Sequence, residues 1–289
     1  MGYIFLLISV LAGGLKGLFG KQISDNVATL KESLAVNTVR CICCVSISFL
    51  IIFFSGGKII CDFNGLIFGS LSGFSLSVFL ITWLFAVKSG AFMLVSVALL
   101  LSSVMTLVLD IVVFGTAVSV RQILGVIILA VAVLIMVSYN NTQKPRINFE
   151  TVILLLLCAV SNGVYEFSQK LFTSFSHSAV SILNLITYTF GAIILFLAAI
   201  LSNKRKSSVK KVLKNNYLRV AFTSICTFAN SYFIAKATLL LSVAQVFLVG
   251  QALSMILSAL IAVKFLGEKI TPRAVIGISL GVLAAILIN

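Results

Sequence analysis

The stretch that decides the fold is the last one, Gly267 to Asn289, which reads GEKITPRAVIGISLGVLAAILIN. It predicts a short polar turn followed by an apolar helix. An earlier stretch, Gly115 to Val137, reads GTAVSVRQILGVIILAVAVLIMV and has the same pattern. The chain is therefore predicted to contain one unit twice. The aligned pairs are Gly115 with Gly267, Arg121 with Arg273, and Gly125 with Gly277.

The composition places most of the chain in a membrane. Of its 289 residues, 61% are hydrophobic and only 10% are charged, whereas soluble domains average about 25% charged residues. The mean hydropathy is +1.21. The net charge is +14. The positively charged residues lie between apolar runs and not along a polar face, which favours a role in membrane orientation over nucleic-acid binding. The sequence thus predicts an all-α polytopic membrane protein.

Ten segments are long and apolar enough to cross a bilayer. Since five is odd, two halves of five spans each enter the membrane from opposite sides, as in the inverted repeats of secondary transporters. A polar seam with Pro145 separates the halves, so we divide the single membrane domain 1–289 into repeats 1–143 and 144–289. The predicted spans are 2–20, 35–54, 64–86, 90–113, 119–138, 151–171, 179–201, 217–236, 240–263 and 271–288.

The stretch LGEKITPRAVIGISLGVLAAILI resembles the closing motif of the drug/metabolite transporter superfamily, specifically its ten-helix EamA-type members. Lys21 and Lys170, each ending the first helix of a half, are similar to the family pattern as well. The resemblance covers nearly the whole chain. It implies an inverted-repeat fold with a central cavity, and the export or exchange of small organic solutes.

The chain departs from that family pattern at several positions. Thr116 stands in the first repeat where Glu268 stands in the second, so only one half keeps the motif glutamate. Ser103 and Met255 replace frequent prolines. Family members generally keep both termini in the cytoplasm, whereas the distribution of Lys and Arg predicts that both termini lie outside.

Glu166 is the leading candidate for substrate contact or ion coupling, because a carboxylate at membrane depth is costly. The alternative is a structural pair with Lys170, one helical turn away. Lys21 and Lys170 either bind an anion or reach the lipid headgroups, and Trp83 lies either in a cavity wall or at the membrane interface. Polar residues in the spans either bind substrate or join helices; they include Asn162, Tyr165, Asn184, Asn230, Tyr232 and Gln245.

These patterns predict a secondary transporter for a small metabolite or drug in the plasma (inner) membrane, working by alternating access. The alternative is a membrane scaffold or partner subunit without transport activity. The sequence has no GxxxxGK[ST] motif for ATP, and its single histidine, His177, has no acid at useful spacing. We therefore expect no enzyme activity, cofactor or metal. The expected partners are a small-molecule substrate, the lipid bilayer, and protons or another coupling ion, with no nucleic acid, in a monomer or homodimer.

Overall fold

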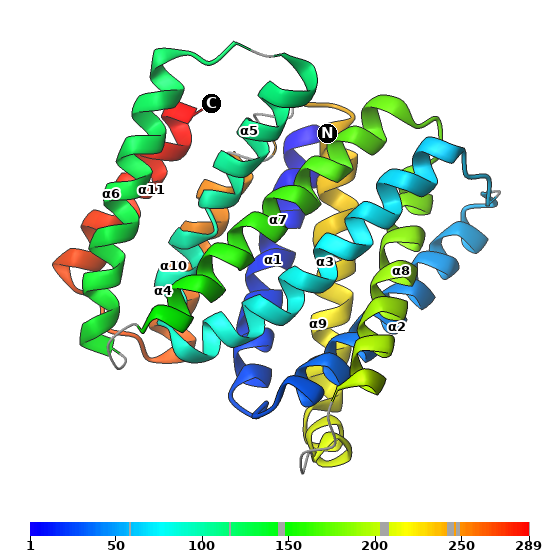
Figure 1. The fold of residues 1–289 in the computed structure, drawn as a ribbon, viewed down its shortest axis with the longest axis horizontal. Helices are drawn as coiled ribbons and strands as arrows, with labels where there is room; N and C mark the ends of the chain where they lie inside the picture. Colours follow the sequence, from blue (N-terminus) through cyan, green and yellow to red (C-terminus); the bar gives the residue numbers. More distant parts are fainter. Residues whose placement is uncertain are drawn as a thin grey trace.

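The structure is a computed structural model that describes residues 1–57, 59–115, 117–143, 148–202, 208–241, 246 and 249–288. Over these residues the chain forms a bundle of long helices (Figure 1). The helices are α1 (Gly2–Ser24), α2 (Leu30–Phe54), α3 (Phe63–Ser89), α4 (Phe92–Ala98), α5 (Leu101–Phe114), α6 (Val120–Gln143), α7 (Phe149–Phe175), α8 (Val180–Leu201), α9 (Val209–Thr238), α10 (Gly250–Leu266) and α11 (Pro272–Ile288).

The predicted ten-pass, all-α architecture is confirmed. Helices α4 and α5 make one pass that is interrupted at Leu99–Leu100, so the eleven helices cross the bundle ten times. Seven spans, with α4 and α5 joined, are long and apolar enough to cross a membrane, and α10 and α11 are shorter apolar helices. Both ends of the chain lie toward the same edge of the bundle, as an even number of passes requires (Figure 1).

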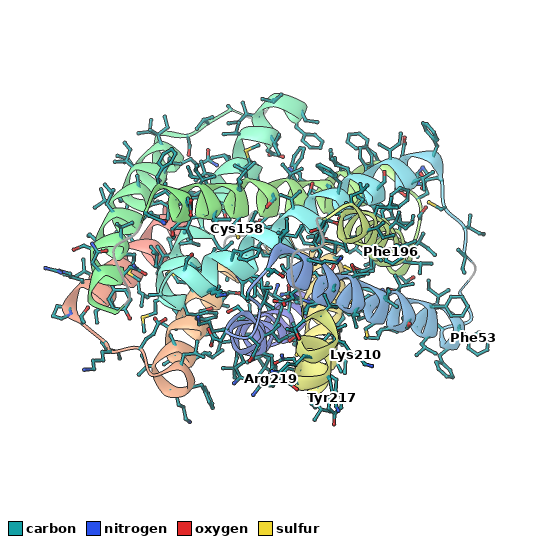
Figure 2. All side chains as sticks on the ribbon, turned by 60° about the horizontal axis from the view of Figure 1, so that its bottom comes forward. Phe53, Cys158, Phe196, Lys210, Tyr217 and Arg219 are labelled. Carbon is teal, nitrogen blue, oxygen red and sulfur yellow. The ribbon has the colours of Figure 1, made fainter. Side chains whose placement is uncertain are left out.

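The outer surface of the bundle is apolar, as contact with lipid requires. Phe53 is 70% exposed and Phe196 is 56% exposed, and both lie at the periphery of the molecule (Figure 2). The first part of α9 has a polar surface instead. It carries Lys210, Tyr217 and Arg219, which lie away from the centre of the bundle (Figure 2). A membrane-embedded bundle with a polar extension on one helix accounts for this distribution.

Three helices begin five or more residues away from their predicted starts, and α2 begins at Leu30 and not at 35. Helix α9 begins at Val209 and not at 217, because its first turns pack against the α1–α2 connection. There Asn26 donates to Asn216, and the backbone N–H of Ser208 donates to Glu32. Helix α10 begins at Gly250 and not at 240. Helix α11 begins at Pro272, and the Thr271 hydroxyl caps it by accepting a hydrogen bond from the N–H of Ala274.

The duplicated stretch packs against its own copy. The aligned glycines Gly115 and Gly267 both end a helix with a left-handed backbone, at φ +65° and +70°, a conformation that glycine adopts at little cost. A Cβ on Gly125 would meet Ala284 and Ile288 of α11, and one on Gly277 would meet Ala132 and Met136 of α6. The same shift along the chain relates the two sets of partners, so α6 and α11 form a pseudo-symmetric pair.

The motif glutamate of the closing stretch joins the two halves. The carboxylate of Glu268 accepts hydrogen bonds from the backbone N–H groups of Phe92 and Met93, and from the Tyr139 hydroxyl. Those N–H groups begin α4 and have no partner inside that helix. Glu268 of the second half therefore caps a helix of the first half.

Candidate functional site

A cavity of about 120 Å³ lies between the two halves of the bundle. Helices α1 to α4 of the first half line it, together with α7, α9 and α10 of the second. Its wall combines apolar residues with polar side chains at the middle of long helices, where lipid offers no hydrogen bonds. The polar lining residues include Ser9, Lys16, Arg40, Asn162, Tyr165, Glu166, Gln169, Thr227, Asn230 and Ser231.

Glu166 lies in this cavity wall and is 6% exposed. Its carboxylate accepts a hydrogen bond of 2.8 Å from Asn162, one turn earlier on α7, and one of 3.5 Å from Ser102 on α5. Asn162 also donates to Ser102 at 3.1 Å. Helix α5 approaches closely here because Gly163 has no side chain: a Cβ on it would lie 2.7 Å from the carbonyl oxygen of Ser102. Asn162 and Ser102 thus hold the Glu166 carboxylate in one position, and Gly163 allows α5 to come close enough for this.

Lys16 faces the cavity from α1 and is half-buried. Its ammonium group donates to Asn230 Oδ1 on α9 at 3.3 Å and lies 5.9 Å from the centre of the Phe79 ring. Asn230 is held in turn by Ser9, to which its amide donates at 2.9 and 3.0 Å. Asn230, a predicted site residue, therefore positions a lysine of the first half by joining α1 to α9.

Arg40 lines the cavity as well, although it is not among the predicted site residues. It is 3% exposed, and its Nε and Nη2 both donate to Thr227 Oγ1, the Nε bond being 2.8 Å long. The distribution of Lys and Arg places Arg40 toward the cytoplasmic end of the predicted span 35–54, but α2 begins at Leu30 and Arg40 lies well inside it. Its position within the apolar run around Cys41 to Cys44 was the available signal, because an arginine in a membrane span marks a functional-site candidate.

Two further predicted residues also line the cavity. The Tyr165 hydroxyl donates to Ser231, and Ser231 donates to Asn184, which links α7, α9 and α8. Trp83 is 5% exposed, and its ring packs against Gly20 of α1. Trp83 lies in the cavity wall together with Phe79 and Phe92.

The other predicted site residues lie elsewhere. Lys170 pairs with Asp110 of α5 and lies 4.6 Å from the centre of the Phe114 ring, so the alternative that paired it with Glu166 is wrong. Lys21 pairs with Asp25 at 3.0 Å and donates to the carbonyl of Val87 at the end of α3. Tyr232 stacks on Phe228. Gln245 lies outside the described residues.

The charges of the cavity break the symmetry of the repeats. The alignment that matches Lys21 with Lys170 places Lys16 opposite Tyr165, and Gly17 opposite Glu166. The first half therefore contributes a cation where the second contributes a phenol, and the second contributes a carboxylate where the first has no side chain. The charged groups of the cavity are therefore distributed unequally between the two halves.

A family model described as the EamA-like transporter family matches residues 1–138 and 150–289. The chain belongs to the EamA-like transporter family. It is accordingly a transporter of the drug/metabolite type and not an enzyme, an integral multi-pass membrane protein that acts on small molecules.

Solved structures share the fold of this EamA-like transporter. One, titled "Crystal structure of protein", has a TM-score of 0.65 and 14% sequence identity, and the match covers 99% of this chain and 95% of that one. No curated protein matches the chain. At that identity the likeness carries the fold alone.

Proposed function

We propose that this EamA-like transporter moves a small organic solute across the membrane by alternating access, as an exporter or exchanger, with the central cavity as its substrate site. The observation that carries the proposal is the cavity between the two halves, lined by polar and charged groups from both. A site between inverted halves can be exposed to each side in turn when one half rocks against the other. No covalent step is required of any lining residue.

We assign Glu166 the central role in this cycle. Its two carboxylate oxygens accept hydrogen bonds from Asn162 and Ser102, which orient the group in the cavity wall. In that position it can receive a proton or a donor group of the solute. Asn162, Tyr165, Trp83 and Asn230 complete the proposed site.

A flux assay tests the proposal. Purified protein in liposomes is given a panel of labelled metabolites, with and without a pH gradient. We expect Glu166→Gln to lower the gradient-driven flux at least about tenfold, which corresponds to about 1.4 kcal/mol. Glu150→Gln is the matched control, because Glu150 lies exposed at the start of the same helix.

Two results would count against the proposal. Unchanged flux in Glu166→Gln would remove the role of Glu166 and leave transport standing. Absence of flux for every solute, together with a protein partner that copurifies stably, would instead favour a membrane scaffold.

A further inference from the structure

The two cations of the cavity, Lys16 and Arg40, form no salt bridge with any residue that the structure describes. Lys16 donates to the neutral amide of Asn230. Arg40 donates twice to the neutral hydroxyl of Thr227. The ion pairs among the described residues are Lys21 with Asp25 and Lys170 with Asp110, both away from the cavity. The hydrogen bonds of Lys16 and Arg40 therefore go to neutral groups, and Glu166 acts on Lys16 electrostatically from across the cavity.

The formal charges of the cavity lining favour an anionic guest. Lys16 and Arg40 are positive and Glu166 is negative, so one further negative charge makes the cavity neutral. A charge held inside a membrane protein without a counter-ion is costly. A bound anion would remove that cost, whereas a cation would add to it.

The geometry of Arg40 suits the same guest. A guanidinium group has five N–H donors, and Thr227 Oγ1 receives donors from Nε and Nη2. The planar fork of arginine matches the two oxygens of a carboxylate or a phosphate. Because Arg40 is 3% exposed and lines the cavity, its surroundings are dry enough to make such a contact strong.

We propose that Lys16 and Arg40 form an anion-binding subsite, and that the transported solute is a small organic acid with a carboxylate or phosphate head group. The inference rests on the proposed function, since it names the substrate class for the same cavity. A volume of about 120 Å³ is close to that of a cavity that holds benzene, about 150 Å³, so the body of the acid is small.

The rest of the cavity defines the body of this acid. Phe79, Trp83 and Phe92 supply an apolar wall. Gln169, which is 2% exposed, also lines the cavity, and its Oε1 atom has no hydrogen-bond partner among the described residues. A buried acceptor without a partner is unfavourable, so a hydroxyl or amino group on the acid would satisfy it.

The only tryptophan of the chain provides a direct readout, because Trp83 lines the cavity. Its fluorescence is followed while purified protein is titrated with matched pairs: lactate and lactamide, propionate and propionamide, and glycerol 3-phosphate and glycerol. We expect at least one acid to bind at least about tenfold more tightly than its neutral counterpart, a difference of about 1.4 kcal/mol. The carboxylate and phosphate pairs identify the head group.

Substitutions then locate the subsite. Lys16→Gln and Arg40→Lys should each weaken binding of the acid and leave the neutral counterpart unaffected. Arg40→Lys keeps the charge and loses the fork, so it remains informative if Arg40→Gln does not fold. Lys264→Gln and Arg219→Lys are matched controls, because both residues are exposed outside the cavity.

Equal affinity for acid and neutral counterpart, no fluorescence response to any of the acids, or unchanged binding in folded Lys16→Gln and Arg40→Lys would overturn the anion subsite. Flux of a neutral or cationic solute that depends on Glu166 would do so as well, and would leave the proposed transport function intact. Acid binding without flux of any solute would overturn the transport function and support the subsite.

Discussion

The pseudo-symmetric pair Gly125 and Gly277 predicts two different responses to the same substitution. A Cβ at Gly125 would lie 2.8 Å from the backbone nitrogen of Ile288 and 3.0 Å from the carbonyl oxygen of Ala284. Backbone atoms cannot rotate away, so α6 and α11 must separate. A Cβ at Gly277 would instead meet the Met136 side chain at 2.6 Å, and the nearest backbone atom lies at 3.6 Å.

The difference in stability can be estimated. Overpacking costs about 1–3 kcal/mol, and replacing a helical glycine by alanine gains up to about 1 kcal/mol. For Gly125→Ala the steric cost dominates, and we expect a net loss of about 1–2 kcal/mol. For Gly277→Ala the flexible thioether of Met136 can adopt another rotamer, so the two terms nearly cancel, to within about 0.5 kcal/mol.

Thermal unfolding in detergent, followed by size-exclusion chromatography of the soluble fraction, measures both variants. At about 2–4 °C per kcal/mol, Gly125→Ala should melt about 2–8 °C below the wild type and Gly277→Ala within about 2 °C of it. Equal destabilisation of the two variants, or a neutral Gly125→Ala, would refute the account of how these helices pack.

Two further predictions concern carboxylates at helix starts. Glu268→Ala should lower the free energy of unfolding by about 1–3 kcal/mol, because the N–H groups of Phe92 and Met93 lose their acceptor; denaturant titration measures this, and no change would contradict the cap. Hydrogen bonds from Ser176 and Ser178 lower the pKa of Asp62 from 3.8 to about 2. A carboxyl group with a lower pKa in the folded state than in the unfolded chain stabilises the fold at pH values above its unfolded pKa. The difference in melting temperature between wild type and Asp62→Asn should therefore stay constant above about pH 4 and shrink as the pH falls toward the pKa of Asp62; a difference that changes between neutral pH and about pH 5 would contradict it.

The sequence was sufficient for the architecture because a bilayer restricts the possible structures. Long apolar runs can cross it only as helices when no barrel pattern exists, so the number of passes followed from composition and length. The repeated Gly115 and Gly267 stretches then determined the inverted symmetry, since five passes separate them. The predicted helix starts were less accurate where the packing of a polar segment sets the first residue of the helix and hydropathy does not, as at Val209.

The candidate site was only partly predictable. Glu166, Asn162 and Trp83 were found because polar or aromatic groups are conspicuous in an apolar helix, and each lines the cavity. Arg40 was missed because a charge near the start of a span is consistent with either a loop or a cavity. Only the contact with Thr227, far away in sequence, distinguishes the two.

By itself, therefore, the sequence determined the class, the number of membrane passes and the duplication, because these depend on hydropathy and spacing along one chain. The tertiary structure alone decided which charges share a cavity. It paired Lys170 with Asp110 and placed Lys16, Arg40 and Glu166 around one space. The physical reason is that side-chain partners inside a membrane bundle depend on which helix faces pack together. The order of residues along the chain does not specify which faces these are.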